Sequence, residues 1–260
     1  MVYVFDGSYA GLMTAVFEVF ERKEFSATIV TQEYYQPRFF EEIRQIVTDH
    51  TKAKRVLKGL ANYTSYAQVW QVWRAFLSED IELYQAVFSV VIDIFRSKRD
   101  VFKNYGDSKI LIFSQAVQKV NREAHRMKAF VRFQRSSDGL FLAVVEPDFN
   151  VLPLISTFFK NRYSDQAWLI FDKKRRYGLH YDLQHVTEVV VSAAESKALV
   201  RATDGVEVDP DDGHYSQLWQ SYFDSTNIKA RKNMKLHLRH VPKRYWKYLP
   251  EKTAALWKEQ

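Results

Sequence analysis

The cationic C-terminal segment is where residue types and their spacing most clearly indicate chemistry. Residues 226–260 contain ten Lys and Arg side chains against two acids, a charge of +8, whereas the rest of the chain sums to −1 and the whole to +7. Charge that served only solubility would be spread over the sequence. A nearly neutral body with one basic segment therefore favours a polyanion-binding surface, and the alternative is a solvated basic tail.

The residues before Pro242 separate into two faces when they are projected onto a helix. At 100° per residue, Ala230, Met234, Leu238 and Val241 fall together, and the cations lie to one side of them. One face of this predicted helix packs on the protein, and the other is cationic.

The same separation recurs in the next segment, between two prolines. Pro242 suits the first turn of a short helix, and Pro250 marks its end. Tyr245, Trp246 and Leu249 share one face of that helix, and its cations occupy the other. We therefore expect the aromatic side chains to fasten the segment to the core, rather than to stack on nucleic-acid bases.

Two successive cationic faces can neutralise several phosphates of a nucleic acid. Such contacts give affinity that falls steeply with salt and carries little sequence information. The expected phosphate contacts are Lys229, Arg231, Lys232, Lys235, Arg239, Lys243, Arg244 and Lys247, with Asn233, Arg126 and Lys128 as secondary contacts. The run KKRR at 173–176 can reach a nucleic acid from a hairpin tip or form a solvated turn.

Three side chains are candidates for acid–base catalysis, namely His125, Asp165 and Glu146. His125 lies where a predicted helix ends, Asp165 follows a short predicted helix, and Glu146 stands at a strand end. Structural roles are the alternative, because a cation at a helix C-terminus and a carboxylate in a turn are both common. The sequence does not show these residues converging.

The sequence contains little that indicates a metal site or a cofactor site. The chain has no cysteine, which excludes disulfides, thiolate metal sites and iron–sulfur clusters. His237 and His240 have a chelating spacing, but no carboxylate in the neighbouring turns completes a site. The common phosphate-binding and nucleophile motifs are also missing. We expect no metal and no cofactor.

The hydrophobic pattern predicts an α+β fold. A helical N-terminal lobe, 1–107, carries short strands at 2–5 and 27–31 and three helices between 38 and 100. The lobe 108–260 begins with a helix to about 126, and the two lobes could form one continuous domain. A ββαββ unit follows, which implies an antiparallel sheet covered by a helix, and then the basic helices. Its elements are expected at 128–134, 140–147, 151–163, 167–172 and 177–182.

The chain lacks the features of a membrane or secreted protein. Its start, MVYVFDGSY, has neither the basic residues nor the apolar run of a signal peptide. The most apolar stretch, 86–95, is about half of a membrane span and contains Asp93. We expect a cytoplasmic protein with no membrane contact.

Five phrases resemble one bacterial family. They are VFDGSYAGLMTAVFEVF, REAHRMKAFVRF, EPDFNVLPLISTFFKNRYSDQAWLIFD, LWQSYF and ARKNMKLHLRHVPKRYWKYLPE. The family is that of DNA metabolism or DNA repair proteins encoded beside a radical-SAM protein of DNA modification or repair, and related domains are fused to uracil-DNA-glycosylase-like domains. The resemblance covers nearly the whole chain and implies DNA and the radical-SAM protein as partners.

The resemblance leaves three functions open. Radical-SAM chemistry requires cysteines and must belong to the partner, and the GQDPY-like and HPS-like motifs of uracil-DNA glycosylases are missing. We therefore expect a DNA-binding accessory or substrate-presenting protein without catalytic activity of its own. The alternatives are an enzyme that acts on a flipped damaged or modified base, and a protein-interaction subunit without direct DNA contact.

Overall fold

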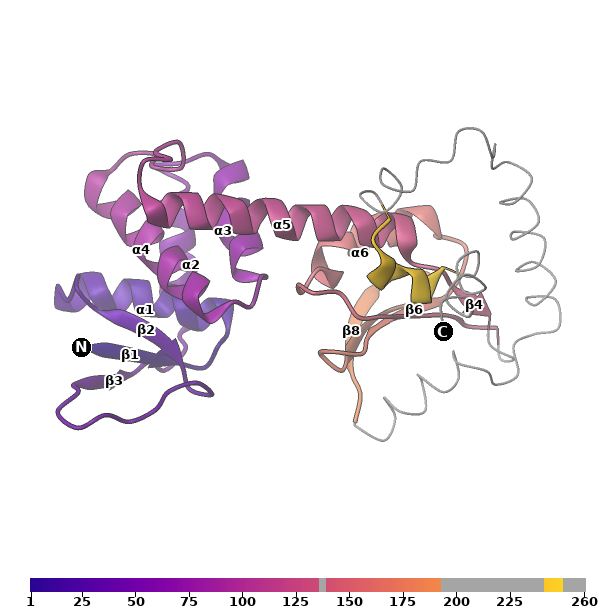
Figure 1. Ribbon diagram of the computed structural model, residues 1–260, viewed down its shortest axis with the longest axis horizontal. Helices are drawn as coiled ribbons and strands as arrows, with labels where there is room; N and C mark the ends of the chain where they lie inside the picture. Colours follow the sequence, from indigo (N-terminus) through magenta and orange to yellow (C-terminus); the bar gives the residue numbers. More distant parts are fainter. Residues whose placement is uncertain (136–138, 193–240, 250–260) are drawn as a thin grey trace. The chain divides into compact units, whose positions relative to one another are not determined.

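The chain divides into two compact units. The computed structural model describes residues 1–135, 139–192 and 241–249 (Figure 1). The N-terminal unit comprises Met1–Glu123 with Asp148–Asn150, and the C-terminal unit comprises Ala124–Pro147 with Val151–Gln260. Each unit contains helices and a sheet, which confirms the α+β class. Among the described residues, no helix combines the length and apolarity that crossing a membrane requires.

The N-terminal unit begins with a strand, a helix and a second strand, as predicted. The region in which three helices were expected does contain three, preceded by a short strand that the sequence did not predict. The elements are β1 (Val2–Phe5), α1 (Tyr9–Arg22), β2 (Thr28–Thr31), β3 (Ile43–Gln45), α2 (His50–Leu60), α3 (Tyr66–Phe76), α4 (Ile81–Ser97) and α5 (Ser108–Phe130), whose last turns belong to the C-terminal unit.

The sheet of the N-terminal unit is parallel, in the order β2-β1-β3. Its register places Val2 of β1 between Thr28 of β2 and Ile43 of β3. The outer edge of β2 is covered, because Gln85 Oε1 of α4 accepts a 2.8 Å hydrogen bond from the Ile29 amide. β3 forms the other edge.

Helices are stacked over one face of this sheet (Figure 1). Aromatic side chains of β1 join the two layers. Tyr3 and Phe5 are fully buried. The Tyr3 ring lies 6.4 Å from Phe88 of α4, and the Phe5 ring lies 5.8 Å from Tyr84 in an edge-to-face contact. Such pairs add about 0.5–1.5 kcal/mol beyond the burial of their area. The alternation of β1 thus fixes which face carries the helices.

The turn from β1 into α1 is organised by one carboxylate. Asp6 Oδ1 accepts from the Ser8 amide at 2.9 Å, and Asp6 Oδ2 accepts from the Thr48 hydroxyl at 2.7 Å. A Cβ on Gly11 would lie 2.3 Å from Asp6 Oδ1, so only glycine fits there. Burial acts to raise the pKa of Asp6, but the hydrogen bonds outweigh it and hold that pKa below its usual range.

The sheet of the C-terminal unit has five strands in chain order, β4-β5-β6-β7-β8. The two hairpins and the intervening helix of the predicted ββαββ unit are present, followed by an additional strand. The sheet is mixed rather than purely antiparallel, because α6 returns the chain so that β5 and β6 pair in parallel. The elements are β4 (Gln134–Arg135), β5 (Phe141–Val145), α6 (Leu152–Arg162), β6 (Trp168–Asp172), β7 (Tyr177–Tyr181), β8 (Val186–Val190) and the 3₁₀ helix η2 (Lys243–Tyr248).

A cluster of rings forms the core beneath this sheet. Trp168 of β6 is fully buried, and Phe159 of α6 is 1 % exposed. The Trp168 ring lies 5.5 Å from Tyr181 of β7, 6.3 Å from Phe159 and 6.2 Å from Phe133. These contacts explain why α6 packs on the sheet through this face.

The prediction of a strand over 128–134 was largely wrong. The helix α5 continues to Phe130, and only Gln134 and Arg135 are in a strand. Met127 and Val131 are both buried, and the Val131 amide donates to the Met127 carbonyl at 3.0 Å. The buried side chains are four residues apart, which is a helical spacing, so the helix continues through the residues KAF that were predicted to begin a strand.

Candidate nucleic-acid interface

The segment after Pro242 is fastened to the protein by its apolar side chains. Tyr245 is 2 % exposed, and Trp246 and Leu249 are each 3 % exposed. The Trp246 indole Nε1 donates to the Val241 carbonyl at 3.1 Å, which gives the buried ring a hydrogen-bond partner. The expected fastening role of these three side chains is confirmed.

Tyr245 is the centre of this attachment, and the last turns of α5 receive it. The Phe130 ring lies 5.2 Å from the Tyr245 ring. The guanidinium groups of Arg126 and Arg244 lie 5.7 and 4.7 Å from the centre of the Tyr245 ring. Arg244 Nη2 also donates to the Tyr245 hydroxyl at 2.6 Å. One ring thus brings together cations that are far apart in the sequence.

Lys243 gains its position from the 3₁₀ geometry. Residues three apart eclipse each other in a 3₁₀ helix, which places Lys243 beside Trp246. The Lys243 Nζ lies 5.8 Å from the centre of the Trp246 ring. Contacts of this kind contribute about 0.5–1 kcal/mol at exposed sites. The buried indole therefore restrains an exposed ammonium group.

We call Arg126, Lys128, Lys243 and Arg244 the α5–η2 surface. Lys243 and Arg244 are exposed, whereas Arg126 and Lys128 are partly exposed. The Lys128 Nζ lies 5.5 Å from the ring of Phe158 in α6. Each of the four cations thus lies over an aromatic ring, and this arrangement suits the binding of an extended polyanion.

The other expected phosphate contacts cannot be placed on this surface. The backbone of Lys247 belongs to η2. Lys229, Arg231, Lys232, Asn233, Lys235 and Arg239 lie outside the described residues, as do His237 and His240.

The KKRR run is a turn between β6 and β7, but its third residue faces inward. The Arg175 side chain is 9 % exposed, and its Nη1 bonds to Asp172 Oδ2 at 2.8 Å and to the Pro147 carbonyl at 3.1 Å. Asp172 is fully buried and also accepts from the amides of Lys174 and Arg175. Burial raises the pKa of Asp172, although Arg175 acts in the opposite direction. Arg175 therefore stabilises the turn.

The three candidates for catalysis are exposed side chains on different elements. Glu146 follows the carboxyl end of β5, whereas Asp165 precedes the amino end of β6. Because β5 and β6 are parallel, with Phe141 opposite Trp168, these carboxylates lie at opposite ends of the sheet. Five residues of strand span roughly 16 Å. The structure does not bring Glu146 and Asp165 together, and His125 lies on α5.

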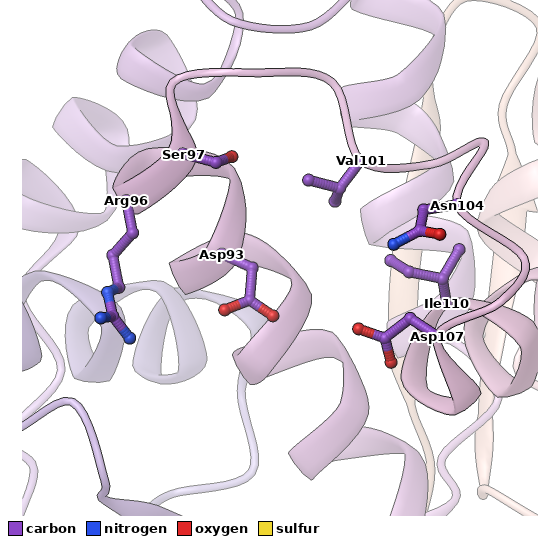
Figure 2. Close-up of a pocket in the computed structure, with 7 residues that line it drawn as sticks. All are labelled: Asp93, Arg96, Ser97, Val101, Asn104, Asp107 and Ile110. Atoms are coloured by element: carbon purple, nitrogen blue, oxygen red, sulfur yellow. The ribbon is translucent and has the colours of Figure 1, made fainter.

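Neither of two cavities in the N-terminal unit is lined by these candidates. The first has a volume of about 410 Å³ and lies between the end of α4 and the start of α5, where Asp93 and Asp107 face its interior (Figure 2). Lys109 Nζ bonds to Asp93 at 2.5 Å and lies 3.7 Å from Asp107. The hydrogen bond that Lys109 donates to Asp93 raises the pKa of Lys109. The second cavity, about 620 Å³, borders β3.

No metal centre is evident in the part of the chain that the structure describes, which contains no group of three or more His, Cys, Asp or Glu side chains able to hold an ion. The Lys109 ammonium instead contacts both carboxylates that line the first cavity. This cavity is a surface hollow with charged side chains in its wall.

The sequence reasoning missed a buried carboxylate in α5. Glu123 is 1 % exposed, and its Oε1 accepts from the Asp148 amide at 3.2 Å. In a helical projection, Glu123 falls on the same stripe as the buried Val120 and Met127. An acid on an apolar stripe was the signal that could have identified it. The contact ties residues 148–150 to the N-terminal unit.

Most of the chain matches one known protein family. Residues 82–251 match DUF4130, a domain of unknown function. The chain belongs to the DUF4130 family. No curated protein and no solved structure matches the chain. The DUF4130 match includes all four residues of the α5–η2 surface, whereas the parallel sheet of the N-terminal unit lies before it.

Proposed function

We propose that this protein binds nucleic acid, most favourably DNA, as an accessory or substrate-presenting component of a DNA repair or modification system. The observation that carries the proposal is the α5–η2 surface, where cations from two distant parts of the chain are held over aromatic rings. Restrained cations lose less side-chain entropy when they contact a phosphate. Phosphate contacts of this kind supply affinity and positioning rather than base recognition.

The charge distribution supports the same function. The segment 226–260 carries +8 on a chain of +7, and η2 belongs to that segment. Its attachment to α5 joins the cationic segment to Arg126 and Lys128. A polyanion that contacts this segment would thereby also reach Arg126 and Lys128 of α5.

The resemblance to DNA repair proteins supplies the proposed partner. We propose that a radical-SAM protein performs the chemistry, because a chain without cysteine cannot hold its iron–sulfur cluster. This protein would then present DNA to that enzyme. Co-purification of the two proteins that survives nuclease treatment would show direct contact, and loss of co-purification after nuclease would show that DNA bridges them.

The enzyme alternative has less support from the geometry. Paired-carboxylate chemistry requires two carboxyl groups within about 10 Å of each other, whereas Glu146 and Asp165 lie at opposite ends of the sheet. Turnover of lesion-bearing oligonucleotides by the purified protein alone would nevertheless establish an activity and displace the accessory role.

Charge reversal at Lys243 is expected to weaken DNA binding. Lys243 is chosen because its ammonium is exposed, whereas Arg244 also bonds to Tyr245 and helps to hold η2. Lys243→Glu should lower the affinity for a labelled duplex several-fold and reduce the magnitude of the salt slope by about one. Fluorescence anisotropy at several salt concentrations measures both quantities.

The matched control is Lys103→Glu, which makes the same charge change at an exposed loop position of the N-terminal unit. It should alter the affinity much less than Lys243→Glu does. Equal effects of the two variants would indicate a general response to net charge and would contradict the assignment to this surface. Circular dichroism checks that both variants are folded.

A further inference from the structure

The two edges of the parallel sheet differ in whether their outward backbone groups have partners among the described residues. Gln85 covers the outer edge of β2 by accepting from the Ile29 amide. At the β3 edge, the Val2 amide donates to the Glu42 carbonyl, and the Ile46 amide donates to the Val4 carbonyl, each at 2.8 Å. Even-numbered residues of this segment therefore bond to β1.

Backbone groups alternate along a strand, so the amide and carbonyl groups of Ile43 and Gln45 point away from β1. Within the described ranges no backbone group pairs with them, so they form a short open edge. The cavity of about 620 Å³ borders this edge and is lined by Arg44, Gln45 and Val47 together with residues of α1 and α2. An open strand edge is a template for pairing with another chain.

Apolar side chains around β3 are unusually exposed. Ile43 is 51 % exposed and Val47 is 81 % exposed. In the turn just before β3, Phe39 and Phe40 are 98 % and 105 % exposed. Exposed apolar patches mark interaction surfaces, and these side chains flank the outward-facing backbone of β3 in the sequence.

The sequence of the edge is complementary to itself when two copies run antiparallel. With a two-fold axis at Ile43, the two Ile43 residues exchange backbone hydrogen bonds, and Glu42 of each copy lies opposite Arg44 of the other. Glu42 is exposed. Arg44 bonds to Glu24 through Nε and Nη2, which leaves Nη1 to face a second carboxylate. Opposite charges across a strand pair contribute about 0.2–1 kcal/mol each.

We propose that β3 is a self-association edge, on which a second copy of this chain adds antiparallel about a two-fold axis at Ile43. The three-stranded sheet then continues across both copies. This antiparallel arrangement brings the Phe39–Phe40 turn of one copy towards the end of β3 in the other, where Val47 is exposed. The interface thus covers the apolar side chains that one copy leaves in solvent. The inference does not depend on nucleic-acid binding.

The test is the oligomeric state of the nuclease-treated full-length chain, measured by sedimentation over a concentration series into the hundred-micromolar range. The wild-type chain should form a dimer. Ile43→Pro removes an outward amide without removing a bond to β1, and it should weaken dimerisation at least tenfold. Glu42→Lys places like charges opposite each other and should weaken it several-fold.

Glu33→Lys serves as the matched control, because it makes the same charge change at an exposed position of the β2–β3 connection outside the paired edge. It should dimerise like the wild-type chain. A wild-type chain that stays monomeric throughout the series would overturn the proposal. Dimerisation by folded Ile43→Pro as tight as that of the wild type would do the same, because the dimer would then use another surface.

Discussion

Replacing Asp172 with alanine is expected to lower the free energy of unfolding by about 3–5 kcal/mol, the usual cost of breaking a buried ion pair. The buried Arg175 would lose the carboxylate that offsets its charge. The amides of Lys174 and Arg175 would also lose their acceptor. Urea unfolding monitored by circular dichroism measures the change.

The adjacent Lys173 provides the control, because it is exposed in the same turn. Lys173→Ala should change the free energy of unfolding by less than about 0.5 kcal/mol. If Asp172→Ala were equally mild, the Asp172–Arg175 pair would not be what holds the turn.

The same carboxyl group predicts a pH dependence. Because burial raises the pKa of Asp172 in the folded protein, the folded state holds this proton more tightly than the unfolded state. Its contribution to stability is therefore present below the ordinary carboxyl pKa of about 4. That contribution is lost as the pH rises through the higher folded-state pKa. Asp172→Asn should remove this part of the pH dependence.

Tyr245→Ala is expected to detach η2 from α5 and to weaken DNA binding. Truncating a buried aromatic side chain removes about 3–5 kcal/mol of packing, which a six-residue 3₁₀ helix cannot replace. Arg126 and Arg244 would lose the ring that positions them. Hydrogen exchange of residues 241–249 should become fast, and the affinity for DNA should fall together with it.

Tyr245→Phe separates the ring from its hydroxyl. The variant keeps the packing against Phe130 and the cation–π contacts, and it loses the bond from Arg244. It should retain η2 and most of the DNA affinity. Fast exchange in Tyr245→Ala without any loss of affinity would show that the α5–η2 surface does not bind DNA.

The sequence predicted those elements whose own residues determine them. The hairpin that contains Trp168 and Tyr181 was predicted because two short runs rich in apolar and aromatic residues are separated by a polar turn. β3 was missed because Ile43–Gln45 is a three-residue strand without that pattern, and its pairing with β1 comes from tertiary structure. The parallel pairing of β5 with β6 likewise depends on the path of α6.

Part of the candidate site was also predicted from the sequence. The helical projection identified Tyr245 and Trp246 as buried and Lys243 as exposed, because a short helix between prolines has one apolar face. It could not show that Arg126 shares the Tyr245 ring, since that contact joins residues far apart in the chain. The inward orientation of Arg175 could not be predicted either. The four consecutive cations at 173–176 do not differ in type, and only the structure shows that Asp172 is buried and pairs with Arg175.

The most direct test of the proposed function is the salt dependence of DNA binding by the wild-type chain. Anisotropy titrations of a labelled duplex and a labelled single strand give the observed association constant at each salt concentration. If the four cations of the α5–η2 surface each neutralise a phosphate of the duplex, the logarithm of that constant should fall with log salt at a slope of about −3.6 or steeper. No binding at low salt, or binding that does not respond to salt, would contradict the account.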